Sequence, residues 1–284
     1  MTQKKRIAVI GAGVLGLSAA RELAQEGADV TLFERRHIGA GTSTMTFAWV
    51  NANGKQPESY HHLNVAAMQE HIVLQQQAQT EGQWLIRSGT YEWATEDKAK
   101  ARLEKRVASL QALHYPALPL TREEITQRVP ELRLDPRAES FWHFPNECLL
   151  HPAILLAYLW SDARRLGATL CNYAEVVDIR EDTQGVTLWL SDGSRWQGDQ
   201  LVIATGRWSQ ELMARLDLQL ALIDASQANK IACGFLALTS PLFTQLSANL
   251  ISPQLNVRPD GGGRLLLQAP DLDYCADPAA SAAV

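Results

Sequence analysis

The spacing at which apolar residues recur changes along the first part of the chain. Residues 6–10, RIAVI, form a short β-branched apolar run, which is typical of a strand buried on both faces of a parallel sheet. Helical periodicity follows over residues 14–25, and Gly27 lies where the end of a helix favours glycine. Residues 29–33, DVTLF, form a second apolar run. This order of strand, helix and strand predicts a βαβ unit.

Three glycines join the first strand to the helix in the pattern GxGxxG. Gly11 allows a tight turn, Gly13 lets a pyrophosphate approach the backbone, and Gly16 lets the helix pack closely. The N–H groups at the start of the helix would face that pyrophosphate. Glu34 ends the second strand about 20 residues further on, where a carboxylate bonds both ribose hydroxyls and repels a 2′-phosphate. Together these features predict a site for FAD or NAD.

The segment after Glu34 helps to choose between the two cofactors. Residues 35–54 are rich in Gly, Ser and Thr, whereas a plain NAD domain continues from its second strand into another helix. Hydroxyl and free N–H groups in such a loop can bond the pyrophosphate and ribityl chain of an extended FAD. A flexible surface loop is the alternative interpretation. The loop favours FAD.

The middle of the chain has a different texture and predicts a separate substrate domain. Apolar residues recur at helical spacing in residues 57–81 and 97–113, and residues 89–96 alternate like a strand. The sequence TREE at 121–124 is a capping box that begins a short helix. One face of the helix over 57–81 is expected to be buried, and it comprises Leu63, Ala67, His71, Leu74 and Ala78.

The nucleotide-binding domain is expected to resume near residue 146. A helix begins at Pro152, residues 185–196 form a hairpin around Asp192-Gly193, and residues 201–205, LVIAT, form another buried strand. Residues 230–238 and 255–268 are expected to be strands of the substrate domain. The three glycines at 261–263 fit a hairpin turn better than a phosphate loop, because no helix follows them.

These patterns predict an α/β protein with two interleaved domains. A Rossmann-like FAD/NAD(P)-binding domain would comprise residues 1–54 and 146–215. An α+β substrate domain built on an antiparallel sheet would comprise residues 55–145 and 216–284.

Composition and charge exclude several classes of function. Apolar residues make up 46% of the chain and the net charge is −5, so no basic surface for nucleic acid is expected. Outside the opening segment with its glycine motif, the longest strongly apolar run, residues 153–160, is too short to span a bilayer. Four cysteines without a CxxC pair predict reduced thiols in a cytoplasmic protein. His61, His62 and His71 lack Cys or carboxylate partners at ligand spacing, so no metal site is expected.

Several quoted segments together resemble one protein family. They are the opening glycine motif, GAGTSTMTFAWVN, NYAEVVDI at 172–179 and DQLVIATGRWS at 199–209. This combination resembles the D-amino-acid oxidase (DAO) family of FAD-dependent oxidoreductases, which includes glycine and sarcosine oxidases. The resemblance implies FAD as cofactor and a small amine or amino acid as substrate. The implied reaction oxidises a C–N bond of a D-amino acid, glycine or an N-methyl amino acid by hydride transfer to flavin.

The resemblance also implies roles for particular residues. Glu34 would bind the ribose, Arg35 would lie at the adenine edge, and the main chain of Val176 would hold the adenine. Gly206 would let the chain pass close to the cofactor. The remaining matches belong to the pyrophosphate turn and the phosphate loop: Gly11, Gly13, Val14, Leu15, Gly16, Ser43 and Thr44.

Members of the family usually continue past the point where this sequence ends. Their last segment returns to the FAD domain with a strand and a glycine-rich turn, and no such pattern follows residue 263. The resemblance therefore implies a C-terminally truncated member whose final FAD-domain segment is absent. Without this segment, apolar core would be exposed on one flank unless a partner chain covers it.

No catalytic residue is assigned, because the flavin performs the difficult step and the protein orients the substrate. Arginine is the natural clamp for a carboxylate, and Arg258 and Arg264 are candidates, although both are expected to be surface residues of a hairpin. Tyr91 and Trp93 are expected in the core. Two other functions stay open: a truncated flavin-binding protein without independent turnover, and an NAD-dependent dehydrogenase.

Overall fold

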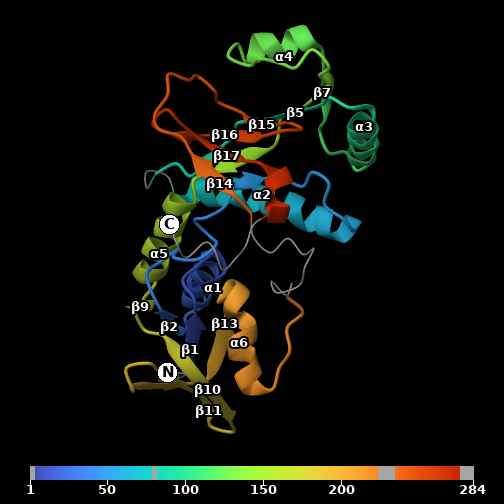
Figure 1. Cartoon of the computed structure of the whole chain (residues 1–284). Helices are drawn as coiled ribbons and strands as arrows, with labels where there is room; N and C mark the ends of the chain where they lie inside the picture. Colours follow the sequence, from blue (N-terminus) through green and yellow to red (C-terminus); the bar gives the residue numbers. More distant parts are fainter. Residues whose placement is uncertain (1–3, 79–81, 223–233, 276–284) are drawn as a thin grey trace. The chain divides into compact units, whose positions relative to one another are not determined.

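A computed structural model describes residues 4–78, 82–222 and 234–275, and these residues form two compact units (Figure 1). Within the described residues, unit 1 comprises 4–46 and 152–222, and unit 2 comprises 47–78, 82–151 and 234–275. The chain therefore passes from one unit to the other after residues 46 and 151. The sequence analysis predicted these boundaries after residues 54 and 145. The difference arises because residues 47–54 carry a short strand that pairs within unit 2.

A four-stranded parallel sheet forms the centre of unit 1. It consists of β13 (Gln200–Ile203), β1 (Arg6–Ile10), β2 (Asp29–Glu34) and β9 (Thr169–Asn172), in that order. Ile10 pairs with Phe33 on one side and with Ile203 on the other, so β1 is a central strand. Four of the five residues of β1 are buried, which confirms the expected strand with both faces covered.

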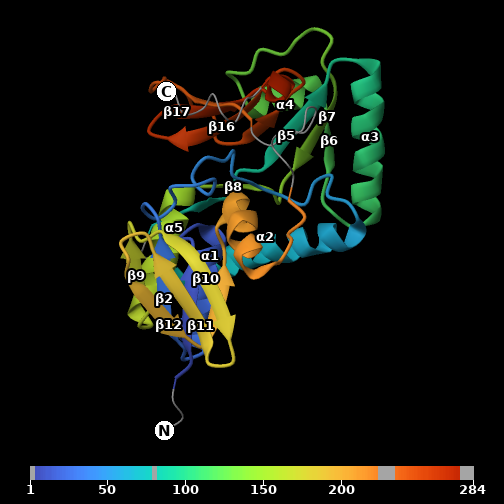
Figure 2. The same ribbon diagram turned by 60° about the horizontal axis from the view of Figure 1, so that its bottom comes forward.

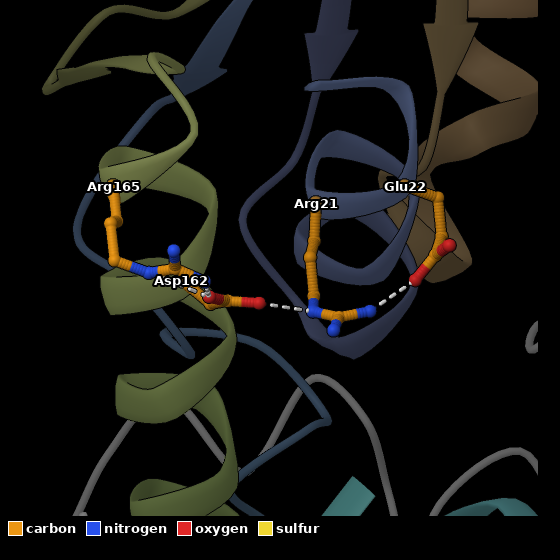
Figure 3. A network of polar contacts seen from close by, with 4 residues as sticks. All are labelled: Arg21, Glu22, Asp162 and Arg165. Carbon is orange, nitrogen blue, oxygen red and sulfur yellow. Dashed lines mark hydrogen bonds and ion pairs between the residues drawn. The ribbon is translucent and has the colours of Figure 1, made fainter. Parts of the chain in front are cut away.

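Two helices of unit 1 are held together by an ion pair. They are α1 (Val14–Gln25) and α5 (Pro152–Arg165), and Arg21 Nε on α1 lies 2.6 Å from Asp162 Oδ2 on α5 (Figure 3). Asp162 also pairs with Arg165. Burial alone would raise the pKa of Asp162, but hydrogen bonds from Arg165 and Arg21 hold it below its usual range.

A second, antiparallel sheet covers one face of the parallel sheet in unit 1 (Figure 2). It contains β10 (Val176–Asp182), β11 (Gly185–Leu190) and β12 (Arg195–Gly198), and it packs through Val176, Ile179 and Leu188 against Ala8, Ile10 and Phe33. The hairpin expected around Asp192-Gly193 is confirmed by the pairing of β11 with β12. After β13 come η1 (Gly206–Trp208), α6 (Ser209–Met213) and η2 (Ala214–Leu216).

Unit 2 is built on a seven-stranded sheet of mostly antiparallel pairs, with β15 and β5 as a parallel pair. In spatial order its strands are β14 (Leu236–Leu238), β17 (Arg264–Gln268), β16 (Asn256–Gly261), β15 (Asn249–Ile251), β5 (Thr90–Ala94), β7 (Glu139–Phe144) and β6 (Leu118–Leu120). A three-stranded sheet contains β3 (Trp49–Val50), β8 (Cys148–Leu150) and β4 (Leu85–Ile86). The expected hairpin around the three glycines is confirmed by β16 and β17. Residues 230–233 of an expected strand lie outside the described residues.

The helices of unit 2 are α2 (Glu58–Ala78), α3 (Asp97–Ala112), α4 (Arg122–Arg128) and the 3₁₀ segment η3 (Pro270–Cys275). The capping box is confirmed, because Thr121 and Glu124 bond each other's backbone N–H groups. Tyr91 and Trp93 lie in an apolar cluster with Ile125 of α4, as expected.

The face expected for α2 is wrong in its first half. Leu63 is 64% exposed, whereas His61 is buried and its Nδ1 lies 2.9 Å from the carbonyl oxygen of Ala52. That buried polar contact, which apolar spacing cannot predict, sets which side of the helix faces the core. No described helix has both the length and the apolar character needed to cross a membrane.

Candidate dinucleotide site

The glycine turn of unit 1 lies at the carboxyl ends of β1 and β13. Gly11 has φ +101°, and a Cβ there would lie 2.6 Å from the carbonyl oxygen of Ala204. A Cβ on Gly16 would lie 1.8 Å from the carbonyl oxygen of Gly11. These contacts exclude a side chain at both positions, because real Cβ atoms do not approach backbone oxygens so closely.

The start of α1 is open toward this turn. Its N-cap residue is Gly13, which has no side chain to cap the helix. The N–H of Val14 instead donates to Ser43 Oγ at 3.0 Å, and a Cβ on Gly13 would lie 2.9 Å from the same oxygen. The sequence therefore brings together a side-chain-free helix start and a hydroxyl from the following loop, which suits an anionic phosphate group.

The Glu34 carboxylate closes one side of the turn. Its Oε2 accepts a hydrogen bond from the N–H of Ala12 at 3.0 Å, and its Oε1 accepts one from the N–H of Arg36 at 2.9 Å. A carboxylate has about four lone-pair positions, so both oxygens can still accept from the hydroxyls of a ribose. The backbone at the end of β2 thus positions the residue that the sequence predicted to hold the ribose.

The loop after Glu34 folds back onto the glycine turn. Gly39 donates its N–H to the carbonyl oxygen of Ala12 at 3.1 Å, and the Thr44 hydroxyl donates to the carbonyl oxygen of Gly39 at 2.7 Å. These two hydrogen bonds tie the segment to the glycine turn and to itself. Ser43 faces the start of α1, whereas the Thr44 hydroxyl is used within the loop.

Arg35 lies over an aromatic ring that the sequence analysis did not single out. Its guanidinium carbon is 4.1 Å from the centroid of Trp208, and that of Arg207 is 4.4 Å from the same centroid. Trp208 also lies beside the loop, because a Cβ on Gly41 would be 3.4 Å from its ring. Sequence spacing gives no signal for this contact, which joins residues on separate segments of unit 1.

The other predicted site residues take different positions around the turn. Val176 is 6% exposed and belongs to the apolar cluster with Ile10, so its side chain is part of the core. Gly206 follows β13 with φ +59°, and no atom lies within 4 Å of a Cβ placed there. Leu15, in the first turn of α1, is 71% exposed.

Among the buried polar residues of unit 2 that the sequence analysis did not assign are Glu147 and Arg258. Glu147 is fully buried and accepts hydrogen bonds from Trp49 Nε1 at 2.8 Å and from the Tyr115 hydroxyl at 3.0 Å. Burial raises its pKa to about 7. Arg258, expected on the surface, is only 2% exposed, whereas Arg264 of the same hairpin is exposed. Within the described residues no three His, Cys, Asp or Glu side chains gather as metal ligands.

A parallel sheet with a glycine turn at its central strand and a carboxylate beside that turn is the arrangement of a dinucleotide-binding fold. The family described as FAD dependent oxidoreductase, DAO, matches residues 6–283, and the chain belongs to this family.

Comparisons with individual proteins agree with this assignment. The chain is 27% identical over 227 residues to a glycine oxidase of Geobacillus kaustophilus, and 28% identical over 246 residues to one of Pseudomonas aeruginosa. These alignments cover 78% and 77% of this chain but only 59% and 60% of the relatives, so the chain spans about 60% of their length.

Solved structures show the same fold. The crystal structure of the G. kaustophilus glycine oxidase matches with a TM-score of 0.81 at 23% identity, covering 94% of this chain and 71% of that one. An L-proline dehydrogenase from P. horikoshii matches with a TM-score of 0.77 at 20% identity, covering 95% and 71%.

Proposed function

We propose that unit 1 binds FAD and that the protein oxidises the C–N bond of a small amine or amino acid. The observation that carries the proposal is the Glu34 carboxylate, held by the N–H groups of Ala12 and Arg36 beside a glycine turn that admits no side chain. Membership of a family of FAD dependent oxidoreductases supports FAD over NAD.

In this proposal the ADP half of the cofactor lies along unit 1. The turn residues Gly11, Gly13 and Gly16, the first turn of α1 at Val14 and Leu15, and the Ser43–Thr44 loop hold the pyrophosphate. Glu34 holds the ribose, while Arg35 and the main chain of Val176 lie toward the adenine. Gly206 has a left-handed backbone conformation and open space beside it, so the chain can pass close to the cofactor there. When bound, the flavin supplies an acceptor for the hydride that leaves the carbon next to the amine nitrogen.

The reaction class follows from what the relatives are called. The matched proteins are named glycine oxidase and L-proline dehydrogenase, which suggests substrates with a C–N bond next to a carboxylate. We also infer a cytoplasmic location, which the unpaired thiols of Cys148 and Cys171 support. The proposal also includes a partner chain that packs beside unit 1. Sedimentation in the analytical ultracentrifuge would then show a defined oligomer.

The first test is a visible absorption spectrum of the purified chain, followed by titration with FAD and, separately, with NAD. The proposal expects a flavin band that survives gel filtration and is lost in Glu34→Ala, while Glu26→Ala, on an exposed residue after α1, keeps it. A chain that binds NAD, or that binds neither cofactor, would overturn the proposal.

The second test follows turnover in the flavin-loaded chain. Glycine, sarcosine, D-alanine and L-proline are offered in turn, and hydrogen peroxide or dye reduction is measured. The proposal expects reduction with at least one of them. A yellow protein that no amine reduces would point to flavin binding without turnover.

A further inference from the structure

Tyr173 is a large aromatic residue that unit 1 holds on its surface at a cost. It directly follows β9, and it is 76% exposed, so most of its ring faces water. Its φ is +55°, a left-handed conformation that bulky residues rarely adopt. Backbone strain of this kind concentrates at ligand-binding and active sites. The strain and the exposure together indicate that this ring has a role beyond the packing of the chain.

The turn that carries Tyr173 lies beside the carboxylate predicted to hold the ribose. β9 is the neighbour of β2, and Asn172 pairs with Glu34 at the carboxyl ends of the two strands. The Tyr173 N–H donates to the carbonyl oxygen of Arg36 at 3.0 Å, and the Ala174 N–H donates to that of Glu34 at 2.9 Å. These two bonds hold the left-handed turn in place. Ligands of parallel sheets bind beyond the carboxyl ends of the strands, which is where Tyr173 lies.

The residues already predicted near the adenine offer no aromatic face to it. The Arg35 guanidinium lies over Trp208, 4.1 Å from the ring centroid, and the Val176 side chain is part of the core. Tyr173 lies between these two in the structure of the site, because its turn is bonded to the end of β2 and leads into β10. A purine base has flat π faces, and an aromatic side chain that stacks on one of them removes apolar surface of both partners from water.

We infer that Tyr173 binds the adenine of the cofactor by stacking its ring on one face of the base. This inference rests on the proposed function, because it adds a residue to the nucleotide site, and all the residues that carry it belong to unit 1. Adenine on the ring would cover apolar surface that the chain alone leaves exposed. The strained turn would then serve to present that surface beside the ribose carboxylate.

The experiment measures the binding of ADP and of inorganic pyrophosphate by calorimetry, with the full chain in its FAD-free form. Pyrophosphate reports on the glycine turn alone, whereas ADP also carries the base. Tyr173→Ala is expected to bind ADP about tenfold more weakly than the wild type and to bind pyrophosphate equally well. Tyr173→Phe, which keeps the ring, should bind ADP like the wild type. Tyr60→Ala, at an exposed tyrosine of unit 2, is the matched control and should change neither affinity.

Tyr173→Gly separates contact with the ligand from a role in folding. Glycine adopts a φ of +55° without strain, so this variant should unfold at a higher urea concentration than Tyr173→Ala. It should nevertheless bind ADP as weakly as Tyr173→Ala does. Wild-type ADP affinity in Tyr173→Gly would overturn the inference, because the ring would then be dispensable.

A second measurement reads the ring directly. The tyrosines are labelled with ¹³C, and the ring resonances of Tyr173 are assigned by their absence in Tyr173→Phe. A stacked base exerts a ring current on the tyrosine, so these resonances should move upfield with ADP and stay in place with pyrophosphate. Resonances that ADP does not move, or equal ADP affinity in the wild type and Tyr173→Ala, would contradict the inference.

The outcomes separate this inference from the proposed function. A chain that binds FAD and has the same ADP affinity with and without the Tyr173 ring keeps the flavin function and loses the stacking residue. A chain whose ADP binding depends on Tyr173 but that takes up no FAD keeps the adenine contact and loses the flavin function. A chain that binds neither ADP nor FAD contradicts both.

Discussion

The dinucleotide site of unit 1 and the buried polar groups of unit 2 are built in different ways. In unit 1 the turn from Gly11 to Gly16 is one continuous stretch of sequence, and the Glu34 and Ser43 side chains accept hydrogen bonds from its backbone N–H groups. In unit 2 the Glu147 carboxyl meets Trp49 and Tyr115, which lie far from it in the sequence. The glycine turn depends on residues that lack side chains and follow one another in the sequence. The polar cluster around Glu147 depends on partners that only the fold brings together.

The largest expected effect comes from filling the space at Gly16. In Gly16→Ala the new Cβ would collide with the carbonyl oxygen of Gly11, so α1 must move away from the turn. We expect FAD affinity to fall more than 100-fold, or the chain to become insoluble, as measured by cofactor titration and circular dichroism. Gly27→Ala, where no atom lies within 4 Å, should cost only about 1 kcal/mol of backbone strain. An unchanged FAD affinity in Gly16→Ala would show that the glycine turn tolerates a side chain at this position.

The next effect concerns pH and Glu147. Its pKa in the folded chain, about 7, lies above its unfolded value, so the folded state binds the extra proton. The contribution of the protonated carboxyl to the free energy of unfolding is therefore complete below pH 4.5 and is lost as pH rises through about 7. This contribution is on the order of 3 kcal/mol. Tyr115, Glu92, Trp49 and Thr90 surround this carboxyl, and of these Glu92 opposes its ionisation.

Urea unfolding of the wild type and of Glu147→Gln between pH 5 and pH 9 measures this contribution. The Gln variant should lose much of the decline in unfolding free energy toward high pH, whereas the exposed Glu181→Gln should keep it. Parallel curves for wild type and Glu147→Gln would mean that this carboxyl does not titrate in the folded protein.

A smaller effect is expected from the hydroxyl at the start of α1. Ser43→Ala removes the acceptor for the Val14 N–H, and the loss of such a cap costs about 1 kcal/mol. FAD affinity should fall about five- to tenfold, measured by fluorescence quenching of the flavin. Thr42→Ala, on an exposed neighbour, serves as control and should leave affinity unchanged.

The smallest effect concerns the arginine stacked on Trp208. Arg35→Gln removes one guanidinium from the ring, and such contacts contribute about 0.5–1 kcal/mol at partly exposed sites. Tryptophan fluorescence should change and FAD affinity should fall about two- to fivefold. Arg36→Gln, at an exposed side chain, should change neither the tryptophan fluorescence nor the FAD affinity. An equal loss of affinity in both variants would mean that the lost positive charge, and not the contact with Trp208, causes the effect.

The sequence predicted best what is local. The turn at Gly11, the strands beside it, the capping box at Thr121 and the hairpin around Gly261 each follow from neighbouring residues. It failed where the deciding contact is distant. His61 sets the buried face of α2 by bonding Ala52, and Arg258 is buried beside Phe47 although its hairpin reads as a surface feature. Neither contact leaves a periodic trace, because each joins residues through tertiary packing.

The central position of β1 also has a consequence for synthesis on the ribosome. Ile10 pairs with Phe33 soon after both are made, but its other neighbour, Ile203, is translated only after the whole first segment of unit 2. Until then the nascent chain carries an apolar strand with one open edge, a state in which chains readily associate. The order of translation thus leaves one edge of this central strand open while residues 47–151 are being made.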